Sequence, residues 1–210
     1  MTYAIIVVGY NRPNELKRLL KSVINADYSG IQVDLVISLD YCDRQGEIKQ
    51  IVKKTEWSHG KKVIRAFSER QGLRNHILQC GDLTLDYDAV IVLEDDLVVA
   101  EGFMHYVVAA CEKYYNDENI AGISLYTHRT NPGNGRFFEA QFNGYDAFFM
   151  QYAQSWGQCW TRKMWNGFRE WYNKNSSNLI FDSRFPNYIG KWNAQSWLKY
   201  YIKYTIEANK

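Results

Sequence analysis

Three consecutive carboxylates, Glu94, Asp95 and Asp96, are the part of this sequence best suited to chemistry. They directly follow an apolar run, residues 89–93, that is typical of a buried strand. Adjacent carboxylates repel one another unless a positive charge neutralises them. A divalent cation can do this, and hard carboxylate oxygens suit Mg²⁺ or Mn²⁺. The cluster therefore predicts a metal site, with an exposed acidic turn as the alternative.

Polar residues also follow two earlier strand-like runs. Asn11 and Arg12 come soon after residues 4–8, and Asp40 follows residues 33–39. Ligands of parallel α/β sheets bind beyond the carboxyl ends of the strands. We therefore expect these side chains to share one edge with the acidic cluster. The alternatives are a surface ion pair for Arg12 and a helix-capping role for Asp40.

The elements that must position these residues alternate along the first half of the chain. Apolar residues at helical spacing follow Pro13, which suits a first helical turn. Strands are expected over residues 4–8, 33–39, 63–67 and 89–93, and helices over 13–24, around 48–52, 73–80 and 103–115. This order predicts an α/β, Rossmann-like domain whose mainly parallel sheet has helices on both faces. Residues 127–144 read as a long loop, a frequent form of lid, and residues 194–208 as an aromatic helix.

Composition restricts the classes of function. A net charge of +2 excludes a strongly basic nucleic-acid reader, so no nucleic-acid partner is expected. Aromatic residues make up 16% of the chain and lie mostly after Phe103. Aromatic rings with polar tips suit the apolar faces and hydroxyls of sugars, although such residues more often fill cores.

The cysteines and the N-terminus bear on location. Cys42, Cys80, Cys111 and Cys159 lack the short spacing of metal ligands. Residues 1–8 contain no basic, signal-like start, and no apolar stretch is long enough to span a bilayer. We expect a cytoplasmic protein with reduced thiols and no transmembrane segment, and peripheral membrane association is left open.

Four segments, in order, resemble glycosyltransferases of the GT-A fold. Residues 91–97 (IVLEDDL) resemble the strand and acidic motif, closest to the EDD form of the N-acetylglucosaminyltransferases that start complex N-glycans and of related bacterial family 2-like enzymes. Residues 7–13 resemble the first strand and turn, residues 37–40 the second strand, and residues 154–157 (QSWG) a Trp-Gly motif on the acceptor side. The resemblance covers roughly residues 3–170.

The resemblance implies a role for each matching residue on the donor side. Arg12 and Asp40 would contact the nucleoside, with Asp40 accepting from the uracil N3–H. Glu94 and Asp95 would lie against the donor's sugar and ribose. Asp96 would ligate Mn²⁺ or Mg²⁺.

The resemblance also assigns residues around the sugar. Trp156 and Gly157 would shape the sugar pocket, with a plain core role as the alternative for Trp156. Arg70 and His76 flank the helix that faces the donor in this family. Contact with phosphate is one reading of these two residues, and a structural role is the favoured one.

The sequence departs from the family where a catalytic base is expected. Members that invert the anomeric carbon use a carboxylate as general base, an Asp that follows a Trp downstream of the Trp-Gly motif. The comparable stretch here, residues 191–197 (KWNAQSW), has amides, among them Asn193. Asp182 and Glu170 remain as candidate bases, and an incomplete site is the alternative.

The expected protein is a single GT-A domain over residues 1–210. Residues 1–125 would bind the nucleotide sugar, and residues 126–210 would form an acceptor side that is incomplete at its C-terminus. The expected activity is metal-dependent, inverting transfer from a UDP-sugar to a carbohydrate or glycoconjugate. One alternative is a sugar-nucleotide pyrophosphorylase, which needs a Gly-rich basic loop after the first strand. The other is a non-catalytic nucleotide- or carbohydrate-binding module.

Overall fold

Four parallel strands form most of the sheet in the computed structural model, which describes residues 1–210. They are β1 (Tyr3–Gly9), β2 (Asp34–Leu39), β3 (Lys62–Ala66) and β4 (Ala89–Glu94). Two short strands, β5 (Ile123–Ser124) and β6 (Gln158–Thr161), extend the sheet with antiparallel pairing. The order is β3-β2-β1-β4-β6-β5. The expected α/β architecture with a mainly parallel sheet is confirmed.

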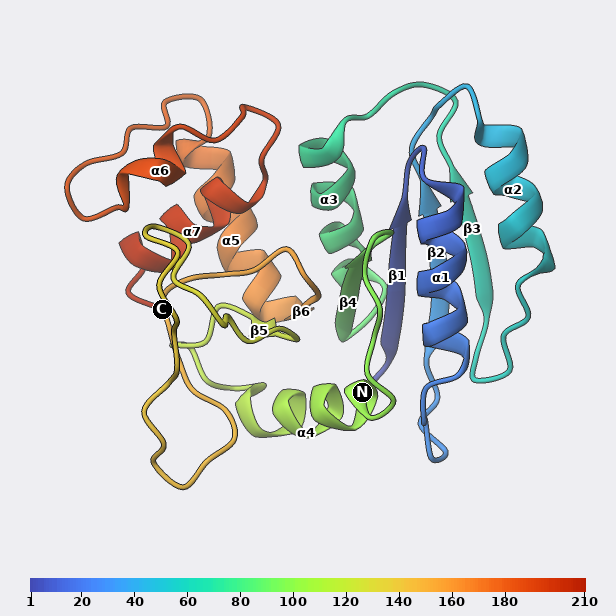
Figure 1. The fold of residues 1–210 in the computed structure, drawn as a ribbon, viewed down its shortest axis with the longest axis horizontal. Helices are drawn as coiled ribbons and strands as arrows, with labels where there is room; N and C mark the ends of the chain where they lie inside the picture. Colours follow the sequence, from blue (N-terminus) through green and yellow to red (C-terminus); the bar gives the residue numbers. More distant parts are fainter.

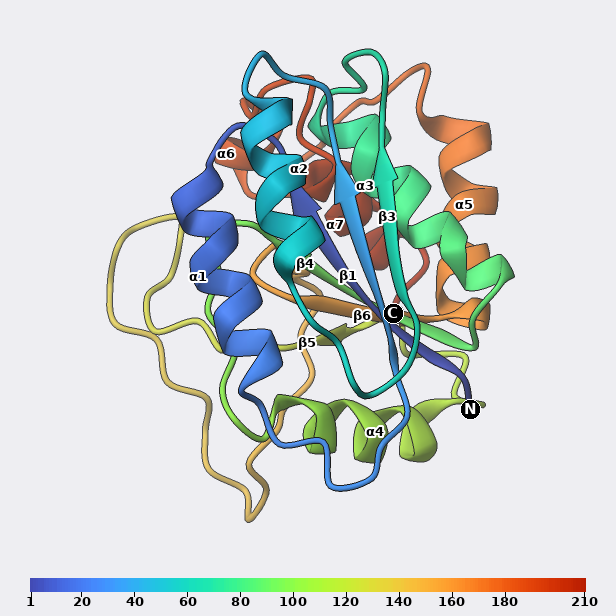
Figure 2. The ribbon, with the colours of Figure 1, turned by 90° about the vertical axis from the view of Figure 1, so that its right-hand side faces the viewer.

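Both faces of the sheet are covered, which explains why β1 is buried along its whole length. One face packs against α1 (Pro13–Ile24), α2 (Gln45–Lys54) and α4 (Phe103–Tyr114). The other packs against α3 (Leu73–Gly81), α5 (Arg162–Asn175) and α7 (Leu198–Glu207). Figure 1 shows α1 and α2 on one side of β1, and α3, α5 and α7 on the other. Figure 2 shows α4 crossing beneath the strands.

Much of the aromatic content of the second half lies in the core of the α3–α5–α7 face. Trp160 of β6 packs against Trp165 of α5 with ring centroids 4.5 Å apart. Phe168 of α5 meets Tyr201 of α7 at 4.7 Å. Trp160, Phe168 and Tyr201 are almost completely buried. These rings stabilise the packing of α5 and α7 on the sheet, and almost none of their surface is available to a ligand.

The expected helices and strands of the first half are all present, with boundaries shifted by a few residues. The aromatic helix expected from residue 194 begins at Leu198. The loop expected over residues 127–144 is part of a longer stretch between β5 and β6. Within this stretch the one β-type pairing is an isolated bridge between Thr130 and Phe137. The structure adds β5, β6, the 3₁₀ helix η1 (Asp82–Leu85) and the short helix α6 (Asn187–Gly190). None of the helices is long and apolar enough to cross a membrane.

Candidate functional site

The polar residues that follow β1 and β4 meet at one edge of the sheet. In the parallel pairing of these strands Val8 lies opposite Glu94, so the residues after each strand emerge side by side. The backbone N–H of Tyr10 donates to Oδ2 of Asp95 at 3.3 Å. The expectation that these segments share the carboxyl edge of the sheet is confirmed.

Arg12 is the counter-ion of the acidic cluster. It precedes Pro13, the first residue of α1, and its guanidinium forms ion pairs with both Asp95 and Asp96. The Nη1–Oδ2 distance to Asp96 is 2.8 Å. The Asp95 side chain is only 3% exposed, whereas that of Asp96 is 44% exposed. Asp96 is therefore the member of this pair that an incoming cation can reach.

Burial decides the protonation of the other two carboxyls. It raises the pKa of Glu94 to about 7, assisted by the negative charges of Asp96 and Asp95 and opposed by a hydrogen bond from Trp197. Burial also raises the pKa of Asp95 to about 6, although Arg12 acts in the opposite direction. Burial alone would lower the pKa of Arg12, but pairing with Asp95 and Asp96 raises it overall. The edge is thus less negative than three ionised carboxylates would make it.

A metal held entirely by protein ligands does not fit this edge. No group of three or more His, Cys, Asp or Glu side chains is placed to hold a metal ion. Mg²⁺ bound with a nucleotide, however, commonly uses one or two carboxylates together with phosphates and water. The exposed carboxylate of Asp96 fits that mode. Its ion pair with Arg12 must open for a cation to take the same oxygen.

Asp40 lies at the same edge, but its carboxylate is occupied. Oδ1 accepts from the backbone N–H groups of Tyr41 at 2.8 Å and Gln71 at 2.7 Å. Oδ2 accepts from Gly72 N–H at 3.0 Å and pairs with Nε of Arg70 at 3.1 Å. A carboxylate has about four acceptor positions. In this conformation Asp40 holds the loop before α3 and offers no free acceptor, so its role in uracil recognition stays a prediction.

The alternative for Asp40 as a helix cap is wrong. Helix α2 begins at Gln45, its N-cap is Arg44, and no side chain caps it. Asp40 instead accepts from the residues that precede α3. The carboxylate therefore orders a loop that is distant in sequence rather than the helix that follows it.

Arg70 and His76 differ in their surroundings. The Arg70 guanidinium stacks on the Tyr10 ring at 3.4 Å and remains about half exposed. His76 is buried, and its Nε2 lies 2.7 Å from Oγ of Ser38. Burial lowers the pKa of His76 to about 4. His76 is a neutral packing residue, whereas Arg70 keeps one face toward solvent beside Asp40.

A cavity of about 780 Å³ opens beside Asp96, which is its only charged lining residue. Trp156 and Gly157 line it, together with Leu93 and Tyr126. Trp156 is half exposed and meets the Tyr126 ring edge-on at 4.5 Å. Gly157 has φ +91°, and a Cβ there would lie 3.0 Å from Leu125 Cβ. A glycine is required at this point by both conformation and space.

The amide-rich segment 191–197 lies against the acidic edge. The indole N–H of Trp197 donates to Oε1 of Glu94 at 3.4 Å. The side-chain oxygen of Gln195 lies 3.1 Å from where a Cβ would stand at Gly72. Oδ1 of Asn193 accepts from the Gln195 N–H at 2.8 Å and so forms a local turn. The structure brings this segment to the site, with an indole rather than a carboxylate nearest Glu94.

Neither candidate base lines the cavity beside Asp96. Asp182 forms an exposed ion pair with Arg184 at 2.7 Å, and that hydrogen-bonded pairing lowers its pKa to about 2. Glu170 is exposed on α5. A carboxylate with so low a pKa is a weak proton acceptor at neutral pH. The structure does not bring either residue to the acidic edge, and the identity of a base stays open.

Two residues of the edge were missed from the sequence. Tyr10 supports Arg70 and supplies a backbone donor to Asp95. Trp197 reaches Glu94 from a segment far along the chain. The position of Tyr10 directly after a buried strand is a signal that predicts the first of these. No local pattern predicts the second, because the contact depends on how α7 packs on the sheet.

Comparison with known proteins identifies the fold. No family model and no curated protein matches the chain. TarS residues 1–349 from S. aureus, solved in complex with UDP, has 12% sequence identity and a TM-score of 0.57; the match covers 99% of this chain and 55% of that one. Another TarS structure has 12% identity and a TM-score of 0.52, covering 96% and 33%. The mannosyltransferase PcManGT from Pyrobaculum calidifontis, in complex with GDP-Man and Mn²⁺, has 14% identity and a TM-score of 0.50, covering 82% and 46%.

These comparisons show a glycosyltransferase-like α/β fold and, at such identities, the fold alone. The matched part of each solved chain is between a third and just over a half of its length. This chain therefore corresponds to part of those proteins.

Proposed function

We propose that this chain is a glycosyltransferase domain that uses a nucleotide-sugar donor, specifically a UDP-sugar, together with Mn²⁺ or Mg²⁺. The observation that carries the proposal is the meeting of Arg12, Asp95 and Asp96 beside the cavity lined by Trp156 and Gly157. Ligands of such sheets bind at this edge. The likeness in fold to TarS and to the mannosyltransferase supports the same reading.

Each residue of the edge has a role that its geometry allows. Asp96 would hold the metal together with the donor's diphosphate, and the metal would supply charge neutralisation as the nucleotide diphosphate leaves. Arg12, once released from Asp96, would keep its ion pair with the buried Asp95 and turn its free N–H groups toward phosphate. Trp156 would contact the apolar face of the sugar, and Gly157 would shape the pocket by allowing the chain to turn against Leu125.

The acceptor is proposed to be a carbohydrate or glycoconjugate, and the transfer is proposed to invert the anomeric carbon. An inverting transfer needs a group that takes the proton of the attacking hydroxyl. Asp182 and Glu170 lie outside the cavity, so neither is assigned this role. This observation keeps the alternative of a module that binds the donor without rapid transfer.

The pyrophosphorylase alternative has less support. It requires free backbone N–H groups after β1 to hold a triphosphate. Here the N–H of Tyr10 is already donated to Asp95, and the turn contains a single glycine, Gly9. The turn is therefore built to hold a carboxylate rather than a run of phosphates.

Calorimetry with UDP, with and without Mn²⁺, tests the proposal. We expect Mn²⁺ to strengthen UDP binding, and Asp96→Ala to remove most of that gain. Asp86→Ala is the matched control, because Asp86 is an exposed carboxylate near the opposite end of β4. UDP affinity that is independent of Mn²⁺, or equal in both variants, would show that the cluster is only an exposed turn.

Product analysis separates the three activities. The chain is incubated with Mn²⁺ and, in separate reactions, with UDP-sugars plus candidate acceptors or with UTP plus sugar 1-phosphates. UDP released from a UDP-sugar supports transfer, pyrophosphate released from UTP and a sugar 1-phosphate supports the pyrophosphorylase, and binding without either product supports a non-catalytic module.

A further inference from the structure

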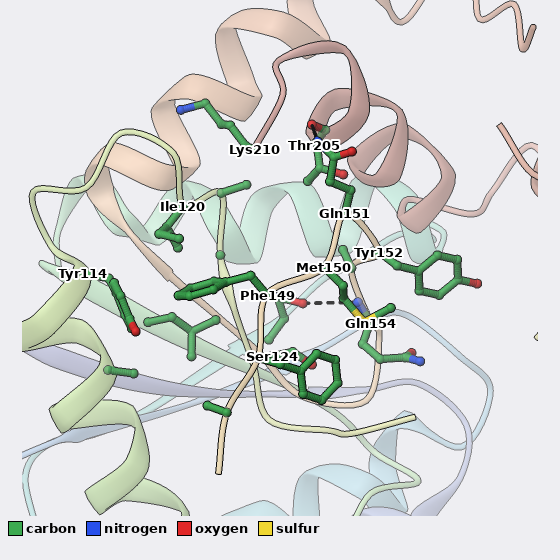
Figure 3. A pocket seen from close by; sticks show the side chains of 18 of the residues that line it. Tyr114, Ile120, Ser124, Phe149, Met150, Gln151, Tyr152, Gln154, Thr205 and Lys210 are labelled. Carbon is green, nitrogen blue, oxygen red and sulfur yellow. Dashed lines mark hydrogen bonds between the residues drawn. The ribbon is translucent and has the colours of Figure 1, made fainter. Parts of the chain in front are cut away.

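A second cavity of about 630 Å³ runs along the outer edge of β5. Its walls are β5, the C-terminal part of α4, the end of α7 and residues 146–154. Figure 3 shows this cavity, with Phe149 pointing across it toward Tyr114. Residues 146–154 make no backbone hydrogen bond to β5, so the edge of the sheet is open to the cavity.

This cavity adjoins the one beside Asp96. Tyr106, Leu125 and Tyr126 line both cavities. Tyr126 also packs against Trp156, which stands in the proposed sugar pocket. A chain-like ligand whose end lies near Asp96 could therefore continue along β5. This position suits the remote part of an acceptor.

An unpartnered donor lies on the floor of the cavity. Gln158 is only 3% exposed. Its side-chain Oε1 accepts from the backbone N–H of Gln154 at 3.4 Å. No hydrogen bond within the chain uses its Nε2. That nitrogen lies 2.8 Å from where a Cβ would stand at Gly122, so only a glycine there lets the amide take this position. The nitrogen keeps some access to the cavity, so water or a ligand hydroxyl can accept from it.

The remaining walls combine aromatic rings and amides. Tyr114 and Phe149 meet edge-on with centroids 5.5 Å apart, and Phe149 is 69% exposed. Gln151 and Asn119 also line this space, and although their amide nitrogens donate within the chain, their amide oxygens accept no hydrogen bond. Rings that cover apolar C–H faces, beside amides that read hydroxyls, are the chemistry of saccharide recognition. An acyl chain would leave the Gln158 donor without an acceptor.

Charge narrows the class of saccharide. Asp117 and Asp146 line the cavity, and Lys210 is the only Lys or Arg that does. The Lys210 ammonium already contacts the backbone oxygen of Glu118. A ligand carrying carboxylates or phosphates would meet more negative than positive charge. The cavity therefore favours a neutral ligand.

We propose that this cavity binds a neutral oligosaccharide, the part of the acceptor that lies away from the reacting hydroxyl. Its role as an acceptor subsite rests on the proposed transfer function, whereas the binding itself does not. The Gln158 amide would donate to a sugar hydroxyl at the floor. Phe149 and Tyr114 would cover a ring face.

Binding to an array of neutral and anionic oligosaccharides, without nucleotide or metal, tests this proposal. We expect neutral oligosaccharides to bind and their sulfated or carboxylated counterparts to bind more weakly. Phe149→Ala should weaken binding about fivefold, the size of one aromatic contact. Phe142→Ala is the matched control, because Phe142 is an exposed aromatic of the same loop outside the cavity, and this variant should bind as wild type.

Gln158→Leu keeps the size of the side chain and removes its donor, and should weaken binding at least about fivefold. Unchanged UDP–Mn²⁺ affinity in these variants shows that each is folded. Absence of any bound oligosaccharide, a preference for anionic ones, or equal loss in Phe149→Ala and Phe142→Ala would overturn the proposal. If UDP does not bind, but neutral oligosaccharides bind and Phe149→Ala weakens that binding, the proposed transfer function is contradicted and the proposed oligosaccharide site is supported.

Discussion

The Trp197 indole donates to Glu94 across a separation of 103 residues. Trp197 is buried and packs edge-on against Trp160 with centroids 5.6 Å apart. The contact ties the amide-rich segment before α7 to the end of β4. The acidic edge is therefore completed from both halves of the chain.

Trp197→Phe is expected to lower the free energy of unfolding by about 1–3 kcal/mol, because the half-buried Glu94 carboxyl loses its donor. Urea denaturation measures the change. Trp156→Phe is the control, since Trp156 is half exposed and surface changes usually stay within about 0.5 kcal/mol. Equal effects in the two variants would mean that the contact to Glu94 contributes nothing.

Arg12→Gln is expected to make the protein more responsive to Mn²⁺ alone. The guanidinium occupies the Asp96 oxygen that a cation needs, so its removal should free that oxygen and leave an unbalanced negative edge. The rise in melting temperature with Mn²⁺ should therefore be larger in Arg12→Gln than in wild type. Arg44→Gln, which removes an exposed pair with Glu47, is the control and should behave as wild type. An identical rise in all three proteins contradicts the competition.

Asp40→Asn is expected to destabilise the fold by about 1–3 kcal/mol. The amide nitrogen would face one of the N–H groups that the carboxylate now accepts from, and the ion pair with Arg70 would be lost. Urea denaturation tests this, with Asp43→Asn as an exposed control. If Asp40→Asn is as stable as wild type and instead loses its preference for UDP over GDP, the residue reads uracil as the family resemblance implies.

His76 is expected to make the protein less stable as the pH falls from about 6.5 to 4. Its pKa is near 6.5 when unfolded and is lowered to about 4 by burial, so the unfolded chain binds the extra proton in this window. The contribution of His76 to the free energy of unfolding is fully present above about pH 6.5. It falls by up to about 3 kcal/mol as the pH reaches about 4. Burial of Glu94 and Asp95 acts in the opposite direction over the same range, so the test is the difference between the slopes of wild type and His76→Gln in urea denaturation series. His105→Gln, at an exposed site, should keep the wild-type slope.

All four cysteines are expected to titrate as thiols in unfolded protein prepared without reductant and protected from air. In the folded protein they should react slowly with a thiol reagent, because all four are buried. Cys111 and Cys159 have sulfurs 3.6 Å apart, so oxidation should join this pair first. A native disulfide found by mass spectrometry would overturn the proposed cytoplasmic location.

The sequence predicts the sheet well where its signals are local. The strands at residues 4–8 and 89–93 are continuous apolar runs buried on both faces, and α1 has one clear apolar stripe after Pro13. The meeting of Arg12 with Asp95 and Asp96 follows from parallel pairing, which brings the carboxyl ends of strands together. These features needed only strand order and periodicity.

Features fixed by packing between distant segments could not be predicted. The strands β5 and β6 are too short for periodicity, and their pairing depends on neighbours far along the chain. The four bonds to Asp40 come from its own neighbour and from a loop 30 or so residues later, which no spacing rule anticipates. The pairing of Asp182 with Arg184 is local, but the placement of Asp182 away from the cavity likewise depends on the path of its loop.

The ion pair between Arg12 and Asp96 has a consequence for the order in which ligands arrive. A free divalent cation would compete with the Arg12 guanidinium for the carboxylate oxygen of Asp96. A free nucleotide diphosphate would be repelled by the cluster of carboxylates. The preformed metal–nucleotide complex alone offers a positive centre to Asp96 and phosphate oxygens to Arg12 in the same encounter. We therefore expect the rate of donor binding to depend on the concentration of the metal–nucleotide complex. The ligand-free protein should bind free metal weakly, and the nucleotide product should dissociate once the metal has left.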